Sequence, residues 1–99
     1  MLYNYFLYIV TNKNKTTLYI GVTNNIQKRL AQHHIDSEHS RKSFAGKYSC
    51  YYLVYYEGFE NPTQAINREK EIKKWRREKK EKLINNFNPK WQFLNWDVF

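Results

Sequence analysis

Short apolar segments alternate with polar ones along the first quarter of the chain, a pattern typical of β-strands joined by a turn. Residues 2–10 (LYNYFLYIV) and 17–22 (TLYIGV) are rich in aromatic and β-branched side chains, which favour strands. Residues 11–16 between them (TNKNKT) are polar and rich in asparagine, as turns are. We therefore predict a β-hairpin over this region.

The register of this hairpin follows from the length of its loop. A four-residue loop at 12–15 places Thr11 opposite Thr16 and Tyr8 opposite Tyr19. Any register that differs by two residues keeps the two phenols on the same face of the hairpin, because side chains alternate between faces.

A helix is predicted directly after the hairpin, over roughly residues 25–34. Asn24 or Thr23 supplies the N-cap, since the side-chain oxygens of these residue types accept hydrogen bonds from the first free backbone N–H groups. Ile26 and Leu30 lie one turn apart and mark the face of this helix that is buried.

A third strand and a long helix follow. Residues 48–56 (YSCYYLVYY) have the composition of a strand. Asn61 followed by Pro62 is a helix start, with a cap and then proline at the first helical position. The helix is predicted to run past Trp75, with or without a break, to about residue 84.

The chain ends in a segment rich in large apolar side chains, and we expect this tail to pack back on the domain. The order of elements is then β-β-α-β-α plus a docked tail, which is a small α+β layer fold. We expect residues 1–84 to form the domain and residues 85–99 the tail. The large apolar residues of the tail are Phe87, Trp91, Phe93, Leu94, Trp96 and Phe99.

Length and charge restrict the classes of protein that fit. A chain of 99 residues supports one domain, which excludes an enzyme with a separate cofactor-binding half. Its 17 basic and 9 acidic residues give a net charge of +8, which favours a polyanionic partner such as nucleic acid. The single cysteine, Cys50, excludes an internal disulfide and a cysteine-based zinc site.

The apolar segments also indicate where the protein works. The longest apolar stretch near the start, residues 6–10, is far too short to cross a bilayer, and no signal-peptide pattern precedes it. We therefore expect a cytoplasmic protein without a membrane partner, associated with the nucleoid when bound to DNA.

Glu69 is the strongest candidate for chemistry. It lies three or four residues from Ala65, Ile66 and Ile72, which mark the predicted core face, whereas Glu71 points away from that face. A carboxylate near the core needs a cation or another partner. That partner is either Arg29 or a neighbouring lysine in a salt bridge, or a hard divalent ion such as Mg²⁺.

Arg29 lies at the edge of the buried face of the first helix, and His33 follows it by one turn. A guanidinium in this position either extends along the surface or points into a cleft and holds a phosphate. The neighbouring His34, Asp36, Glu38 and His39 fit no metal-ligand spacing and are interpreted as part of a solvated connection that runs through residues 35–47.

Two phenols and a glycine share one face of the predicted hairpin. Tyr19 and Gly21 are two residues apart, and Tyr8 joins them from the first strand. The glycine leaves an open patch at which a ligand can approach the backbone. Each tyrosine is either a packing residue or a general base, and the second role requires a nearby cation that lowers the cost of losing the proton.

Residues 68–82 carry nine basic and four acidic side chains. Such a face either keeps a helix soluble or follows a phosphate backbone. Its candidate substrate-binding residues are Arg68, Lys73 and Arg76.

Together these residues resemble the GIY-YIG nuclease superfamily. Phe6-Leu7-Tyr8 and Tyr19-Ile20-Gly21 are similar to the two tripeptides that name it, although Phe6 and Leu7 replace the usual glycine and isoleucine. Asn12 follows the first tripeptide, and Arg68-Glu69-Lys70 resembles the helix that carries the metal-binding glutamate. The resemblance spans about residues 3–80 and is greatest to small stand-alone bacterial members.

The resemblance implies a three-stranded antiparallel sheet flanked by helices and metal-dependent hydrolysis of DNA phosphodiester bonds. It implies that Glu69 binds one Mg²⁺ or Mn²⁺ ion and that Tyr19 helps to deprotonate the attacking water, with Tyr8 assisting or substituting. Arg29 would stabilise charge on the phosphoryl oxygens. His33 would contact the phosphate or the hydrogen-bond network of the nucleophile, and Tyr48 matches a further tyrosine of the site.

An alternative function stays open on the sequence. Phe6 in the first tripeptide and the small size of the chain are compatible with a nucleic-acid-binding module of the same fold that has little or no catalytic turnover. An adaptor that binds other proteins through its aromatic tail is a third class.

Overall fold

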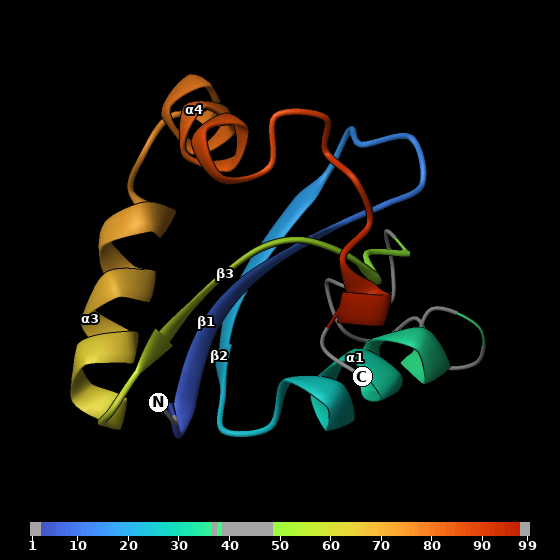
Figure 1. The fold of residues 1–99 in the computed structure, drawn as a ribbon. Coiled ribbons are helices and arrows are strands. Elements are labelled where there is room, and N and C mark those ends of the chain that lie inside the picture. The colour runs from blue at the N-terminus through green and yellow to red at the C-terminus, as the bar shows by residue number, and fades with distance from the viewer. Residues whose placement is uncertain (1–2, 37, 39–48, 98–99) are drawn as a thin grey trace.

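Two strands, a helix, a third strand and two further helices follow one another along the chain, in the predicted order (Figure 1). This computed structural model describes residues 3–36, 38 and 49–97. The elements are β1 (Tyr5–Thr11), β2 (Leu18–Thr23), α1 (Ile26–Ile35), β3 (Tyr52–Phe59), α3 (Pro62–Lys73), α4 (Arg77–Phe87) and a short 3₁₀ helix, η2 (Asn95–Asp97).

Asparagine side chains start two of the helices. The N-cap of α1 is Asn25, whose side chain accepts a hydrogen bond from the backbone of Lys28, so the prediction of Asn24 or Thr23 as the cap is wrong. Thr23 instead accepts a hydrogen bond from the backbone N–H of Asn25 and shapes the turn before the helix. Asn61 caps α3 in the predicted manner, with proline at the first helical position.

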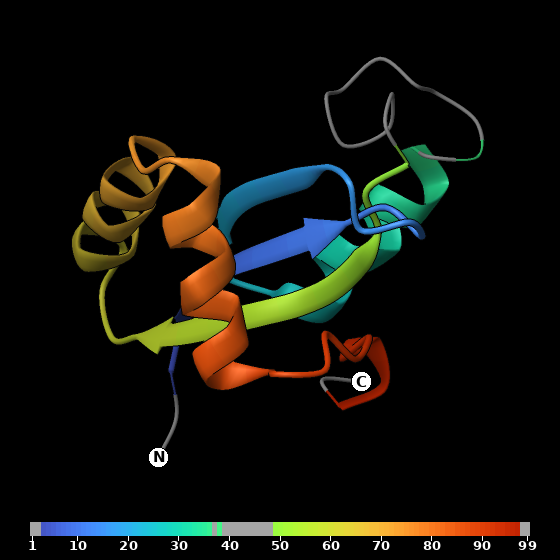
Figure 2. The same ribbon diagram turned by 90° about the horizontal axis from the view of Figure 1, so that it is seen from above.

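The long second helix is broken into α3 and α4. α3 ends at Lys73, and the backbone of Arg76 is extended before α4 begins. Arg76 makes no side-chain cap hydrogen bond, so no local sequence signal marks the start of α4. The break turns α4 across the end of α3 (Figure 2).

The three strands form an antiparallel sheet in the order β2-β1-β3. The predicted hairpin register is wrong by two residues, since Tyr8 pairs with Gly21 and Thr11 pairs with Leu18. A shift of two residues keeps every side chain on its face. Tyr8 and Tyr19 therefore still share a face, with their ring centroids 6.3 Å apart.

The loop is longer than predicted because Asn12 closes it. The side-chain oxygen of Asn12 accepts hydrogen bonds from the backbone of Thr16 at 2.8 Å and of Thr17 at 3.1 Å. These bonds hold residues 12–17 as a compact loop, so the ladder begins only at Leu18.

Each face of the sheet has its own core. Leu7 and Ile9 point to the face that packs on α3 and α4, together with Ile72 and Ile84. Tyr8 and Val10 point to the opposite face, where Ile26 and Leu30 of α1 cover them. Figures 1 and 2 show α3 and α4 on one side of the sheet and α1 on the other. β2 is an edge strand, so residues from both faces can meet along it.

The tail packs back on the domain, as expected, through apolar and polar contacts together: Phe93 stacks on Tyr52 of β3, and Leu94 packs against the core that α1 covers. The side chain of Asn95 accepts a hydrogen bond from Leu53 N–H and donates one to the carbonyl of Tyr51. Asn95 is 4% exposed, whereas Trp96 is 83% exposed. The expectation that large apolar side chains drive the docking is therefore wrong for Trp96, and Phe99 lies outside the described residues.

In the part of the chain that the structure describes, every helix is too short or too polar to cross a membrane.

Candidate active site

The buried face of α1 positions Arg29 and His33. Ile26 and His33 are seven residues apart and so lie almost in line along the helix, which places the His33 ring in the interior at 1% exposure. Arg29 is offset from that line by about 60°. It is therefore half-buried, with its stem against the domain and its guanidinium at the edge.

The same geometry on α3 explains Glu69. Ala65 and Ile72 are fully buried, and Glu69 lies about 40° to one side of their line, with Arg68 about 60° to the other side. Both charged side chains are half-buried, at 21% and 25% exposure. Ile66 lies about 100° from Ala65 and is 40% exposed, so its assignment to the core face is wrong.

A hydrogen-bonded cluster joins β1 to α1. The Tyr8 hydroxyl lies 2.8 Å from Nε2 of His33, and Nε of Arg29 donates to the Tyr8 oxygen at 3.1 Å. Tyr8 and His33 are both 1% exposed. A buried phenol thus connects a buried imidazole to a guanidinium that reaches the surface.

Burial keeps the two interior groups of this cluster neutral. The pKa of His33 is lowered to about 4, mainly by burial and next by the positive charge of Arg29, against a smaller opposite effect of Asp36. Burial raises the pKa of Tyr8 to about 12, although the hydrogen bond and charge of Arg29 oppose the rise. At neutral pH the phenol keeps its proton, and Nε2 of the uncharged imidazole can accept a hydrogen bond from the hydroxyl group.

His33 has one unused polar atom. Nδ1 has no hydrogen-bond partner among the described residues, although the ring is buried. An unpaired buried nitrogen costs free energy, which is typical of a ring held in place for chemistry and not for stability.

Arg29 binds both phenols. It is hydrogen-bonded to Tyr8 and to Tyr19, and although burial alone lowers the pKa of Arg29, these two partners raise it overall. The Tyr19 ring also packs edge-on against His33, with centroids 5.2 Å apart. Four residues predicted from the sequence, on three different elements, are therefore in mutual contact.

Tyr19 also lines a groove along the edge strand. This groove has a volume of about 330 Å³ and lies between β2 and the two helices α3 and α4. Two of its lining residues are lysines. The full lining is Leu18, Tyr19, Ile20, Lys73 and Lys80. The phenol cluster on one face of the sheet is therefore open to a basic groove at the sheet edge.

Glu69 is linked to both the groove and the cluster. Its carboxylate pairs with Nζ of Lys73 at 3.3 Å, which is the lysine partner that one of the two interpretations of the sequence required. Its negative charge also contributes to the raised pKa of Tyr8, after the larger effects of burial, Arg29 and Tyr19. The charge of Glu69 is therefore near enough to act on Tyr8, whereas Glu71 is 55% exposed and pairs with Arg68.

The space next to Gly21 is occupied and not open. A Cβ atom at Gly21 would lie 2.5 Å from the Tyr8 hydroxyl oxygen and 2.6 Å from the ring carbon that bears it. The prediction of an open patch for a ligand is wrong, because Tyr8 is the direct cross-strand neighbour of Gly21 and its ring covers the glycine.

Arg68 and Arg76, two predicted substrate-binding residues, lie apart from this cluster. The guanidinium of Arg68 pairs with Glu57 of β3 and with Glu71, and it lies over the ring of Trp75. Arg76 is exposed in the connection between α3 and α4. Tyr48, the further tyrosine that the family resemblance assigned to the site, lies outside the described residues.

Lys80 is a groove residue that the sequence did not single out. It lies seven residues after Lys73, but on α4, and it reaches the groove because the chain turns at 74–76. The only sequence signal was its place in the basic segment 68–82, which does not distinguish it from its neighbours.

The donor set of this region fits a hard divalent ion with few protein ligands. No group of three or more His, Cys, Asp or Glu side chains converges within the described residues, so a site made entirely of protein ligands is absent there. Mg²⁺ needs only one or two carboxylates when water and phosphate complete its shell. Glu69 is partly accessible and offers one such carboxylate.

Comparison with known proteins agrees with this arrangement. Residues 4–83 match the GIY-YIG family, described as the GIY-YIG catalytic domain. The chain belongs to this family. The match includes both strands of the hairpin, α1, β3 and α3, and so every residue of the cluster.

Individual relatives cover most of the chain. A UPF0213 protein of Natronomonas pharaonis is 35% identical over 81 residues, which are 82% of this chain and 91% of that protein. A UPF0213 protein of Clostridium perfringens is 37% identical over 83 residues, 82% of this chain and 83% of that protein. The solution NMR structure of a UPF0213 protein from Bacillus halodurans has a TM-score of 0.51 at 25% identity, and 82% of each chain is aligned. The GIY-YIG domain supports a nuclease-like function.

Proposed function

We propose that this protein is a metal-dependent endonuclease that hydrolyses phosphodiester bonds in DNA. The observation that carries the proposal is the contact between Tyr8, Tyr19, Arg29 and His33 beside a basic groove, with Glu69 paired to a lysine that lines the groove. This combination brings together a proton-accepting network, a phosphate-binding cation and a carboxylate for a divalent ion. In-line attack of water on a phosphodiester needs these three functions.

Arg29 and the groove lysines bind the scissile phosphate. Only Nε of Arg29 is used in its bond to Tyr8, so guanidinium N–H groups remain to donate to phosphoryl oxygens. Lys73 and Lys80 supply further positive charge along the groove. The cationic groups stabilise the charge that develops on the phosphoryl oxygens as water attacks.

The phenols and His33 move the proton of the attacking water. Tyr8 takes up that proton as it passes its own hydroxyl proton to Nε2 of His33 over the 2.8 Å hydrogen bond, and Tyr19, at the groove, helps by accepting a hydrogen bond from the water. Burial, and after it the positive charge of Arg29, make His33 a weak base. A bound phosphate offsets that charge, so the substrate itself increases the basicity of His33.

Glu69 is the residue that holds the metal ion in this proposal. When bound, a divalent ion polarises the phosphoryl group and stabilises the leaving oxygen. Lys73 pairs with Oε2 of Glu69 at 3.3 Å, so an ion held by this carboxylate would weaken the pair and would leave the ammonium group able to contact the phosphate backbone.

The test is cleavage of DNA by the purified protein. Branched, single-stranded and duplex DNA are incubated with the protein, with and without Mg²⁺ or Mn²⁺. We expect cleavage that requires the metal and disappears in Glu69→Ala and Arg29→Ala. Absence of metal-dependent cleavage on all three substrates would contradict the proposal.

The Glu69–Lys73 pair also favours an alternative, a nucleic-acid-binding module with little or no turnover. In that case the ammonium group is the lasting partner of the carboxylate. The two functions differ in Glu69→Ala, which abolishes cutting by a nuclease but leaves or improves binding, since a group that repels phosphate is lost. A binder shows no cutting, and its affinity falls with salt by about 0.9 log units per phosphate contact per decade.

A further inference from the structure

A row of aromatic rings lies outside the proposed active site, where the hairpin loop, the end of α1, the start of β3 and the tail meet. The rings of His34 and Tyr51 stack at 4.3 Å with an angle of 23° between their planes. Those of Tyr52 and Phe93 stack in the same manner, at 4.3 Å and 22°. Tyr51 and Tyr52 connect the two pairs at 4.9 Å. We call these four residues the aromatic row.

The aromatic row is accessible. The His34 side chain is 48% exposed and Phe93 is 36% exposed, while the two tyrosines are half-buried. None of the four belongs to either core cluster of the sheet. A pocket of about 200 Å³ opens beside the row, lined by Lys13, His34, Glu38, Ser49, Tyr51 and Tyr52.

Two lysines of the hairpin loop give this surface a positive charge. Lys13 lines the pocket, and Nζ of Lys15 lies 5.3 Å from the centre of the Phe93 ring. The acidic residue of the pocket, Glu38, is paired with His34 at 2.9 Å. Cationic groups therefore remain to attract an anionic ligand.

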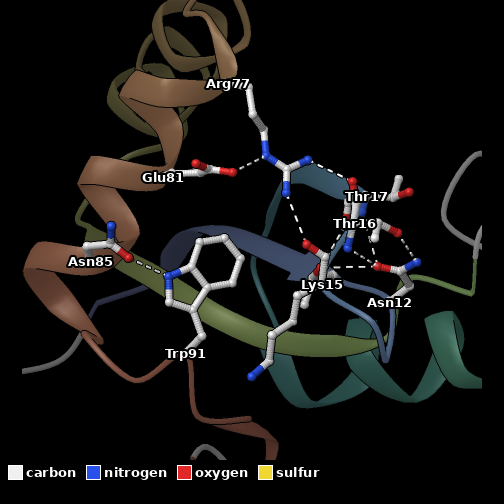
Figure 3. A network of polar contacts seen from close by, with 9 residues as sticks. Asn12, Lys15, Thr16, Thr17, Arg77, Glu81, Asn85 and Trp91 are labelled. Carbon is white, nitrogen blue, oxygen red and sulfur yellow. Dashed lines mark hydrogen bonds and ion pairs between the residues drawn. The ribbon is translucent and has the colours of Figure 1, made fainter.

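The loop that carries the lysines is held in place (Figure 3). Arg77 of α4 donates to the carbonyl oxygens of Thr16 at 2.8 Å and Lys15 at 3.1 Å, and Glu81 orients its guanidinium. Figure 3 shows the Lys15 side chain extending away from Arg77, so the anchor uses the backbone of Lys15 and leaves its ammonium group to the surface. A surface that is already ordered loses less entropy when a ligand binds.

We propose that the aromatic row, with Lys13 and Lys15, binds unpaired nucleotides of a single-stranded nucleic acid. Unpaired bases stack on exposed aromatic rings, while nearby lysines neutralise the phosphates between the bases. Bases in a duplex already stack on each other and present no free face, so the surface selects single strands. The inference rests on the proposed function, because that function identifies the polyanion as nucleic acid.

The row adjoins the proposed active site through two neighbouring histidines. The His33 ring turns inward to Tyr8, and the next ring, His34, turns outward to Tyr51. Adjacent residues on a helix point about 100° apart, so one helical turn serves both surfaces. The aromatic row and the buried Tyr8–His33 pair are therefore joined through one turn of α1.

The experiment compares two ligands that differ only in their bases. Fluorescence anisotropy measures the affinity of the full chain for oligothymidine and for an abasic sugar-phosphate chain of equal length, in EDTA so that no cleavage interferes. We expect Tyr51→Ala to weaken oligothymidine binding by about fivefold or more, the loss of one stacked base, and to leave abasic binding unchanged. Tyr51→Phe keeps the ring and should keep the affinity. Lys13→Ala should weaken both ligands equally.

A second variant covers the case in which Tyr51→Ala does not fold. His34→Ala should show the same base-dependent loss, and His34→Phe should restore it. The inference would be overturned if these variants lost affinity equally for oligothymidine and the abasic chain, or lost none. It would also be overturned if an acidic peptide displaced oligothymidine and the abasic chain equally well. DNA cleavage by the wild-type protein is scored separately, so failure of this inference and failure of the nuclease proposal are distinguishable.

Discussion

Gly21 lies directly opposite Tyr8 in the β1–β2 ladder, and the Tyr8 ring fills the space where a side chain at position 21 would stand. The glycine is thus required by the position of a candidate catalytic phenol and not by a turn. This close approach connects the second tripeptide of the family to the first.

Gly21→Ala should therefore displace Tyr8. The added Cβ would lie 2.5 Å from the phenol oxygen, and a buried ring has no free space to move into. We expect a loss of about 1–3 kcal/mol in the free energy of unfolding, measured by urea denaturation, together with loss of cleavage. Gly58→Ala is the matched control. Its Cβ would meet both the ring and the Cβ atom of Tyr3, so it also costs stability, but Tyr3 lies outside the candidate cluster and cleavage by the folded protein should stay intact.

Glu69→Ala should reduce cleavage by about 100-fold or more, the scale on which loss of one electrostatic group acts in an active site. DNA affinity in EDTA should be unchanged or higher. Glu71→Ala is the control, because Glu71 is on the same helix but 55% exposed and paired with Arg68. Equal losses of cleavage in the two variants would contradict a specific role for Glu69.

Arg29→Lys should behave as a disruptive substitution although it keeps the charge. A lysine has no planar fork and cannot bond to both phenols and a phosphate together. We expect cleavage to fall by about 100-fold. Lys28→Ala, a change in the exposed neighbour on the same helix, should alter cleavage little. Wild-type rates in Arg29→Lys would show that positive charge alone is enough.

His33 should make folding stability depend on pH. Its pKa in the folded state is about 4, below the ordinary value of 6.5, so the unfolded chain binds the proton more readily. The contribution of His33 to the free energy of unfolding is fully present above pH 6.5 and is lost as pH falls towards 4. It amounts to about 3 kcal/mol at 1.36 kcal/mol per pKa unit. Urea unfolding from pH 7 to pH 4 should therefore show a shallower decline in His33→Gln than in the wild type. Parallel curves would mean that His33 is not the titrating group.

Asn95→Ala should release the tail. It removes a buried amide that is bonded to the backbone of Leu53 and Tyr51, and it leaves those buried groups unpaired. We expect a loss of about 1–3 kcal/mol in unfolding free energy. Trp96→Ala should stay within about 0.5 kcal/mol of the wild type, since the ring is 83% exposed. The reverse order of effects would indicate apolar docking.

Local patterns were sufficient to predict the strands and most of the buried faces, but not the start of α4 or the exposure of Ile66. The aromatic and β-branched segments became strands, Asn61-Pro62 began a helix, and the 3.6-residue period placed Ile26, Leu30 and Ile72 in the core. The faces survived the error in register because side chains alternate every second residue, so a shift of two changes no face.

Long-range contacts escaped prediction because no local pattern records them. The sequence placed Arg68 and Glu69 together, but α3 directs one to Glu57 of β3 and the other to Lys73 and the phenols. Similarly, the aromatic tail suggested apolar docking, which Phe93 makes on Tyr52, but the hydrogen bonds of the buried Asn95 amide to the backbone of β3 had no signal in the sequence.

The sequence by itself determined which residues can transfer a proton or bind a phosphate or a metal ion, because this depends on residue type. It also determined which face of its element each of them occupies, because this depends on a fixed periodicity. The tertiary structure alone decided that Tyr8 bonds to His33, that Gly21 lies beneath its ring, and that Lys80 reaches the groove beside Tyr19. Such pairings depend on how sheet and helices pack in three dimensions, and the side chains involved are brought together only when both faces of the sheet are covered.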